Sequence, residues 1–200
     1  MRSPKSSLDN PATAVVRTLR ESIAAKEQLC QEPHVSRIVQ VAEVLAAALR
    51  SGRKILLFGN GGSAADAQHI AAELVGRFAK PRRGYPALSL AVDPSVMTAI
   101  SNDFGYDQTF ARQVEALGQS GDVAVGISTS GNSPNVLAGI RQAKRQGLRT
   151  VALTGGNGGA LAGEAEVAVV VPSTSTPRIQ EAHITIGHTV CELLDEQLAS

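Results

Sequence analysis

Five short apolar runs, separated by stretches with helical spacing, constrain the fold of this chain more than any other feature. The runs cover residues 54–58, 87–91, 123–128, 150–154 and 167–171. Short apolar runs that are bounded by glycine clusters are typical of buried strands. Helical patterns lie between them, at residues 63–78, 94–102, 107–117, 133–146 and around Ala160. This alternation predicts βαβ units, and hence a parallel sheet with helices on both faces.

Three more helices are predicted outside the alternating region. Apolar spacing predicts helices over residues 13–31 and 35–50, before any strand, and a long last helix over 177–198. The predicted fold class is therefore α/β, a three-layer α/β/α sandwich with a five-stranded parallel sheet, flavodoxin- or Rossmann-like, preceded by two N-terminal helices. A chain of 200 residues fits one domain with a terminal extension. We expect a flexible tail over residues 1–12 and a single domain over residues 13–200.

Composition argues against several classes of function. A formal net charge of +1 disfavours an electrostatic nucleic-acid binder, and the basic run at residues 80–83 is predicted to be a solvated loop. No apolar stretch approaches the length of a membrane span. Cys30 and Cys191 lack CxxC spacing, so we expect reduced thiols in the core of a cytoplasmic protein. Neither nucleic acid nor a membrane is an expected partner.

The segment Ser-Thr-Ser-Gly-Asn-Ser-Pro at residues 128–134 is the strongest candidate for ligand binding. It joins a predicted strand to a predicted helix and places Pro134 where the first helical turn favours proline. Backbone N–H groups at a helix start can bind an anion without a nearby cation. The loop adds four hydroxyl groups, those of Ser128, Thr129, Ser130 and Ser133. Since a helix cap needs a single hydroxyl, this density predicts a phosphate site.

Two other loops are rich in glycine. The segment Gly-Asn-Gly-Gly-Ser at residues 59–63 follows the first predicted strand, and Ser63 suits a helix N-cap. The loop also fits a loose Gly-x-Gly-x-x-Ala dinucleotide pattern, which carries little weight alone. A tight turn with a cap explains it equally well. The third loop, residues 154–159, lacks this hydroxyl density and is interpreted as structural.

Titratable side chains gather on two of the predicted helices. His69 and Glu73 are four residues apart and therefore project from the same helix face. Gln180, His183 and His188 lie in a mostly apolar part of the last helix. Neutral imidazoles with carboxylate or amide oxygens suit Zn²⁺ or a similar divalent ion. Solvated His–Glu pairs and buried, hydrogen-bonded histidines are the commoner outcome of such spacing.

The order of these motifs resembles the phosphoheptose isomerases, within the sugar-isomerase (SIS) domain family. The resemblance rests on residues 59–69 with Glu73, on residues 101–103, on residues 127–133 and on residues 178–181. It covers essentially residues 13–198, and its first motif is long enough to be specific. It implies interconversion of D-sedoheptulose 7-phosphate and D-glycero-D-manno-heptose 7-phosphate through an enediol, the first step toward ADP- or GDP-activated heptose. It also implies a homotetramer with active sites between subunits.

The resemblance further implies roles for individual residues. The implied substrate contacts are Asn60, Gly61, Gly62, Ser63, Glu73, Asn102, Asp103, Ser128, Thr129, Ser130, Ser133 and Gln180. One Zn²⁺ per subunit is implied, with the ligands His69, Glu73, Gln180 and His188. Glu73 and His188 are the implied acid/base pair, and this fits their chemistry, because a carboxylate can take a proton from carbon while an imidazole polarises the oxygen.

Helix geometry adds one expectation about the implied metal site. Gln180 and His188 are eight residues apart, about 12 Å along a regular helix, so both would reach one ion only under strain. We therefore expect the site to be assembled from more than one chain, or the helix to be distorted near Gly187.

Two other functions compete with the isomerase. Non-catalytic SIS proteins that associate with the replication initiator share the loop pattern. Proteins of that group lack an acidic residue at the position of Glu73 and a histidine at the position of His188. The presence of both residues favours the enzyme. An NADP-dependent oxidoreductase is suggested by the loose glycine pattern and by Arg82 and Arg83. The chain has no room for a separate substrate domain, and the hydroxyl-rich loop favours a monophosphate.

Overall fold

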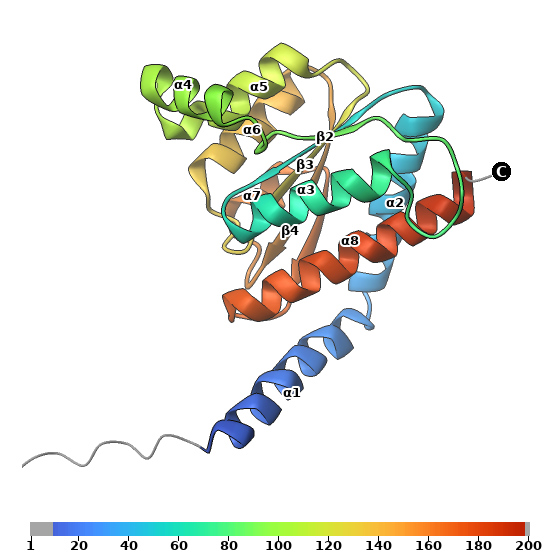
Figure 1. Ribbon diagram of the computed structural model, residues 1–200, viewed down its shortest axis with the longest axis vertical. Helices are drawn as coiled ribbons and strands as arrows, with labels where there is room; N and C mark the ends of the chain where they lie inside the picture. Colours follow the sequence, from blue (N-terminus) through green and yellow to red (C-terminus); the bar gives the residue numbers. More distant parts are fainter. Residues whose placement is uncertain (1–9, 199–200) are drawn as a thin grey trace, which may run out of the picture.

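The apolar runs form a five-stranded sheet that is buried on both faces. In the computed structural model, which describes residues 10–198, every pair of neighbouring strands is parallel. The strands are β1 (Ile55–Gly59), β2 (Ala87–Ser89), β3 (Val123–Ser128), β4 (Arg149–Gly155) and β5 (Val167–Val171), in the spatial order β2-β1-β3-β4-β5. The predicted α/β class and the five-stranded parallel sheet are confirmed (Figure 1).

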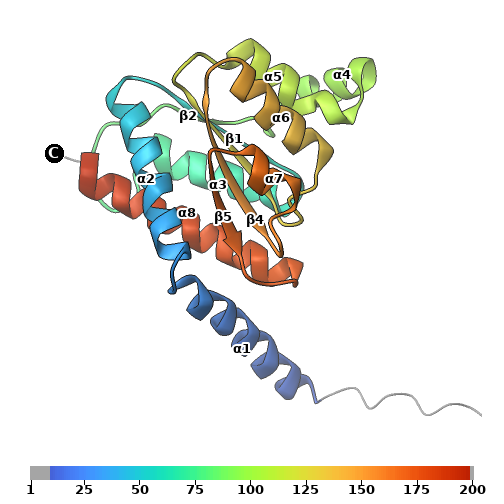
Figure 2. The ribbon, with the colours of Figure 1, turned by 180° about the vertical axis from the view of Figure 1, so that it is seen from behind.

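Helices cover the sheet in the predicted three layers. The described residues form the helices α1 (Pro11–Leu29), α2 (His34–Arg50), α3 (Gly62–Val75), α4 (Pro94–Phe104), α5 (Thr109–Leu117), α6 (Pro134–Arg145), α7 (Gly159–Glu164) and α8 (Thr176–Leu198), with a 3₁₀ turn η1 (Tyr106–Gln108) before α5. Successive side chains of β1 point to opposite faces. Ile55 and Leu57 pack with α2, α3 and α8, whereas Leu56 and Phe58 pack with α5, α6 and α7. Figure 2 shows the helices on the two faces of the sheet. No helix within residues 10–198 is both long and apolar enough to cross a membrane.

The strand order creates a crevice at the carboxyl ends of β1 and β3. α3 leads from β1 to β2 on one side, and the chain then returns to place β3 on the other side of β1. Loops that leave two such strands run in opposite directions and open a ligand-binding crevice between them. Gly59 at the end of β1 is paired with Ile127 near the end of β3. The glycine loop and the hydroxyl-rich loop therefore start side by side.

The N-terminal helix begins two residues earlier than predicted, inside the predicted tail. The side chain of Asn10 accepts a hydrogen bond from the N–H of Ala12 at 3.0 Å, and Pro11 occupies the first turn, where proline is favoured. Pro11 and Ala12 are therefore helical, and residues 1–9 of the predicted tail lie outside the described part of the chain. α1 projects away from the body of the molecule (Figure 1).

The boundaries of α3 differ from the prediction at both ends. Gly61, with φ of +53°, caps the helix, so α3 starts at Gly62 and the predicted cap Ser63 lies inside its first turn. At the other end Gly76 caps the helix with its N–H bonded to the carbonyl of Ala72 at 2.8 Å. Phe78 therefore lies in the following loop rather than in the helix.

Two surface assignments were wrong. Cys30 is exposed because it directly follows α1 at the turn into α2, whereas Cys191 is buried as predicted. The basic run at residues 80–83 is not a fully solvated loop, since the side chain of Arg82 is 3% exposed and is paired with Asp195.

Candidate functional site

Three hydroxyl groups converge where β3 ends. The Oγ atom of Ser128 lies 2.9 Å from that of Ser133 and 3.5 Å from that of Ser130. Ser133 directly precedes α6, but its side chain makes no capping bond to the helix. Its hydroxyl faces Ser128 instead. A helix start offers backbone N–H groups and the positive end of a dipole, so this arrangement can bind a phosphate.

A cavity of about 860 Å³ opens beside these hydroxyls. Thr129 and Ser130 of the hydroxyl-rich loop line it. The other lining residues are Gly155, Gly156 and Asn157 at the end of β4, Pro172, Ser173 and Thr174 after β5, and Thr176 and Ile179 in the first turns of α8. The segment 154–159, which we interpreted as structural, therefore contributes to the candidate binding site. It approaches the hydroxyl-rich loop so closely that a Cβ on Gly131 would overlap the carbonyl oxygen of Gly158.

Two residues that the sequence did not reveal hold the side chain of Asn60. The amides of Asn60 and Asn135 exchange two hydrogen bonds of 2.8 Å, and the Tyr106 hydroxyl donates to Oδ1 of Asn60 at 2.9 Å. Asn135 is 1% exposed and also accepts from the N–H of Val136 at 3.0 Å. These bonds fix which way the Asn60 amide points. Asn135 could have been noticed in the sequence, because it is a polar residue directly after Pro134, where the buried face of α6 begins. No sequence pattern indicates Tyr106.

Asn102 and Asp103, two predicted substrate contacts, lie on α4. Both are exposed, and the Asn102 amide donates to the Asp103 carboxylate at 2.8 Å. Among the described residues, neither is hydrogen-bonded to the two loops at the crevice. The structure therefore does not bring this pair together with the rest of the predicted site within one chain.

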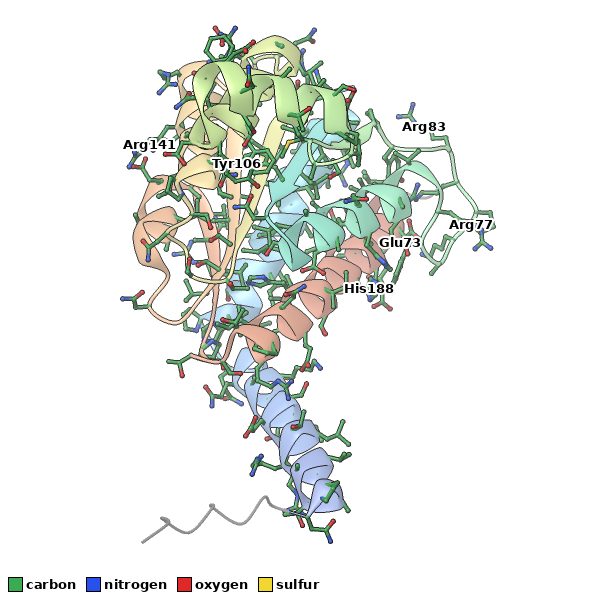
Figure 3. The ribbon with its side chains drawn as sticks, turned by 60° about the vertical axis from the view of Figure 1, so that its left-hand side comes forward. Glu73, Arg77, Arg83, Tyr106, Arg141 and His188 are labelled. Atoms are coloured by element: carbon green, nitrogen blue, oxygen red, sulfur yellow. The ribbon has the colours of Figure 1, made fainter. Side chains whose placement is uncertain are left out.

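His69, Glu73 and His188 form the second part of the candidate site. The Nε2 atom of His69 lies 3.2 Å from Oε1 of Glu73 and 2.9 Å from Nε2 of His188. One ligand atom from each residue lies within 4.8 Å of the other two. Figure 3 shows Glu73 on α3 next to His188 on α8. The predicted projection of His69 and Glu73 from one helix face is confirmed.

A glycine allows α3 and α8 to bring these residues together. A Cβ on Gly187 would lie 2.6 Å from Cδ1 of Ile70. Real side chains do not approach so closely, so the absence of a side chain at position 187 lets α8 pack directly on Ile70 of α3. α8 runs without interruption from Thr176 to Leu198, so the helix does not break at Gly187.

Gln180 and His183 lie apart from the cluster. A Cβ on Gly62 would overlap the side-chain amide of Gln180, so this amide rests on the glycine loop. The structure thus brings together three of the four predicted metal ligands in one chain. His183 is buried, and its Nε2 bonds to the carbonyl of Thr154 at 3.1 Å. Burial lowers the pKa of His183 to about 4, which makes it a neutral core residue.

Two buried groups flank the cluster. Burial raises the pKa of the Asp66 carboxyl to about 6, against the opposing attraction of His69. Burial also raises the pKa of the Cys191 thiol to about 12, and the negative charge of Glu73 adds to this effect. Cys191 is therefore an inert thiol next to Glu73 rather than a nucleophile.

Known proteins share both the sequence and the fold. The SIS-domain family matches residues 19–155, more than half of the chain. The phosphoheptose isomerase of Aquifex aeolicus (strain VF5) is 54% identical over 184 residues, which cover 92% of this chain and 96% of that protein. A solved structure of the phosphoheptose isomerase from Neisseria gonorrhoeae has a TM-score of 0.88 and 43% identity, covering 94% of this chain and all of that one. For a phosphoheptose isomerase from Francisella tularensis the TM-score is 0.89 with 35% identity, over 94% of this chain and 99% of that one. The chain therefore belongs to the SIS-domain family and, within it, to the phosphoheptose isomerases.

Proposed function

We propose that the chain interconverts D-sedoheptulose 7-phosphate and D-glycero-D-manno-heptose 7-phosphate, and so starts the formation of nucleotide-activated heptose. The meeting of His69, Glu73 and His188 at the crossing of α3 and α8 carries this proposal. The relatives are named phosphoheptose isomerases, which supports this reaction over a non-catalytic SIS protein and over an NADP-dependent oxidoreductase. We keep the cytoplasmic location as part of the proposal, since both cysteines are free thiols.

The chemistry of the two proposed proton-transfer residues fits an aldose–ketose isomerase. Glu73 takes a proton from C1 of the ketose and returns it to C2, through an enediol. His188 moves the accompanying proton from the oxygen on C1 to the oxygen on C2. A partly buried carboxylate and an imidazole within reach of each other are the groups that general acid/base catalysis needs.

The cluster fits a divalent metal ion, and we propose Zn²⁺. Two imidazole nitrogens and one carboxylate oxygen, all within 4.8 Å, form a donor set that zinc favours. His69, Glu73 and His188 would hold the ion. When bound, a zinc ion acts as a Lewis acid on a carbonyl oxygen.

The phosphate group of the substrate is assigned to the hydroxyl-rich loop. Ser128, Ser130 and Ser133 converge there, and Thr129 lines the adjoining cavity. Asn60, held by Asn135 and Tyr106, would contact the sugar. Next to Asn60, the start of α3 is formed by Gly61, Gly62 and Ser63, which we also assign to substrate binding. Asn102 and Asp103 stay proposed substrate contacts that would complete the site in the assembled protein.

The assembly proposed is a homotetramer with sites between subunits. Gln180 rests on Gly62 at one end of α8, while His188 lies about 12 Å further along the helix. A Gln180 from a second chain could complete the cluster without strain. Val15, Val16, Leu19 and Ile23 on α1 are 47–59% exposed, and such an apolar stripe is typical of a subunit interface.

One experiment tests the reaction directly. Pure protein is incubated with sedoheptulose 7-phosphate, with and without a chelator, and the aldose is followed by NMR. We expect product that falls when the metal is removed. Absence of product in both preparations would reject the isomerase, and unchanged turnover by a Glu73→Gln variant would reject the assigned base and favour a non-catalytic SIS protein.

A further inference from the structure

A buried arginine lies at the end of α3, in the loop that leads to β2. The guanidinium of Arg82 donates to the carbonyl of Glu73 at 2.9 Å, to that of Leu74 at 3.0 Å and to that of Arg83 at 3.1 Å. The last carbonyls of a helix have no partner within the helix, and a cation is favourable at that end. Arg82 therefore fixes the last turn of α3, and it binds the backbone of Glu73 itself.

Arg82 is joined to α8 by a buried ion pair. Its Nε donates to Oδ1 of Asp195 at 2.5 Å, and the two side chains are 3% and 1% exposed. Oδ2 of Asp195 accepts from the N–H groups of Ala79 and Lys80 at 2.8 and 2.9 Å. Asp195 follows His188 by seven residues, roughly two helical turns, so both lie on the same side of α8.

The same pair anchors the loop after α3, which covers His188 on one side and is called the covering loop below. The Ala79 and Lys80 N–H groups that bind Asp195 directly follow Phe78, whose ring lies 5.6 Å from the ring of His188. Both helices and the covering loop are thus tied to one carboxylate–guanidinium contact.

We propose that Arg82 and Asp195 are positioning residues of the isomerase, which set the distance between the Glu73 carboxylate and the His188 imidazole. The proposal rests on the roles assigned to these two residues above. Replacing a buried ion pair with apolar side chains of similar size is often neutral or stabilising, so such a pair is weak evidence of a stabilising role. The bonds to the backbone of Glu73 and of the covering loop give this pair a geometric role instead.

The planar guanidinium is essential to the arrangement. Arg82 serves one carboxylate and three carbonyls with donors in fixed directions, whereas a lysine ammonium is a compact charge with three donors. An Arg82→Lys variant keeps the charge beside Asp195 and loses the hold on the carbonyl of Glu73. Asp195→Asn keeps the shape and removes the charge.

The chain offers a matched control for a purely structural effect. Asp122 is also 1% exposed, accepts from Nζ of Lys54 at 2.6 Å and accepts from two backbone N–H groups, those of Lys54 and Gln119. It lies before β3, at the opposite end of the sheet from the loops of the site. Asp122→Asn should therefore lower stability as Asp195→Asn does, without touching the cluster. Arg83→Lys controls for a change of basic residue in the same loop.

The experiment uses the full chain loaded with Zn²⁺. Thermal unfolding, kcat and KM for sedoheptulose 7-phosphate, and the rate of zinc release to a chromogenic chelator are measured well below the melting temperature. We expect Arg82→Lys and Asp195→Asn to lower kcat about tenfold or more with little change in KM, and to speed zinc release, because small displacements of reacting groups have large kinetic effects. Asp122→Asn and Arg83→Lys should keep wild-type kcat and release.

The outcomes separate the two proposals. Wild-type kcat and zinc release in both Arg82→Lys and Asp195→Asn, or equal losses in Asp195→Asn and Asp122→Asn, would overturn the positioning role. A wild-type protein that does not turn over the substrate would reject the proposed function, and zinc release would then still decide whether the pair holds the cluster together.

Discussion

The Nε2 atoms of His69 and His188 lie 2.9 Å apart, although 119 positions separate the two residues in the chain. Two imidazole nitrogens can meet at this distance if one donates a hydrogen to the other, and two unprotonated nitrogens would need a cation between them. The carboxylate of Glu73 lies 3.2 Å from the same atom of His69. The packing of α3 on α8 therefore decides whether the cluster exists.

The first prediction concerns Gly187, where the two helices touch. Gly187→Ala places a methyl group against the side chain of Ile70, so either Ile70 turns or α8 moves away from α3. Ile70 is buried and has little room to turn, so we expect α8 to move and to separate His188 from His69. Overpacking of this kind costs about 1–3 kcal/mol of unfolding free energy. We expect calorimetry to show a lower melting temperature. We also expect the isomerase assay to show a loss of turnover by the folded protein that is larger than this modest destabilisation alone would cause.

Gly163→Ala is the matched control for this change. Gly163 also lies in a helix, and a Cβ there meets no atom within 4 Å. This variant should keep wild-type turnover. Wild-type activity in Gly187→Ala would show that the close approach of the helices is not needed.

The second prediction tests whether one site draws on two chains. Gln180→Ala and His188→Ala should each be nearly inactive as pure proteins. If Gln180 of one chain serves the cluster of another, co-expression of the two variants creates some sites in which both residues are intact. We expect mixed assemblies, purified through two different tags, to regain part of the turnover. Mixed assemblies as inactive as their parents would contradict a shared site.

Local sequence patterns predicted the layers of this fold but not its long-range contacts. Apolar periodicity reports which face of an element is buried, so the order of strands and helices followed from it. The density of hydroxyls after β3 likewise predicted the place where Ser128, Ser130 and Ser133 meet. No local pattern indicates that Asp195 pairs with Arg82, 113 positions away, so the sequence alone predicts a solvated loop for the basic run at residues 80–83.

The position of Gln180 shows both the value and the limit of such reasoning. Helix rise alone indicated that Gln180 and His188 could not serve one ion in one chain without strain. It could not show that Gly62 leaves room for the Gln180 amide, nor that Gly187 serves the packing of α8 on Ile70. Each depends on a second element that lies far away in the sequence.

The third prediction concerns the amide pair beneath Asn60. In Asn135→Asp, an ionised carboxylate cannot donate to Oδ1 of Asn60, so the buried pair loses a bond and the Asn60 amide turns. Leaving a buried polar group unpaired costs about 1–3 kcal/mol. We expect a higher KM and a lower unfolding free energy. Tyr106→Phe removes one bond at an exposed site and should raise KM less than Asn135→Asp does. A larger increase of KM in Tyr106→Phe would contradict the proposed role of Asn135 in holding Asn60.

The fourth prediction concerns the phosphate. Ser133→Ala removes one hydroxyl that we assign to a charged ligand, and such a bond is worth about 1.5–3 kcal/mol, or roughly 10- to 150-fold in affinity. We expect KM for the sugar phosphate and the inhibition constant of inorganic phosphate to rise together, with kcat nearly unchanged. Ser120→Ala, at an exposed serine before β3, is the control. Unchanged phosphate inhibition in Ser133→Ala would place the phosphate elsewhere.

The fifth prediction follows from His183 in the core. Its Nε2 donates to the Thr154 carbonyl, and its Nδ1 has no partner among the described residues, so protonation would bury an unpaired N–H. Burial lowers its pKa from 6.5 to about 4, so between these values the unfolded chain binds a proton that the folded chain does not. The unfolding free energy therefore falls as the pH falls through this range, by up to about 3 kcal/mol from this residue. Gln at position 183 can still donate to Thr154 and does not titrate. Denaturant unfolding between pH 4 and pH 7 should give a shallower pH dependence for His183→Gln than for the wild type, and identical slopes would show that His183 is not the residue that links pH to stability.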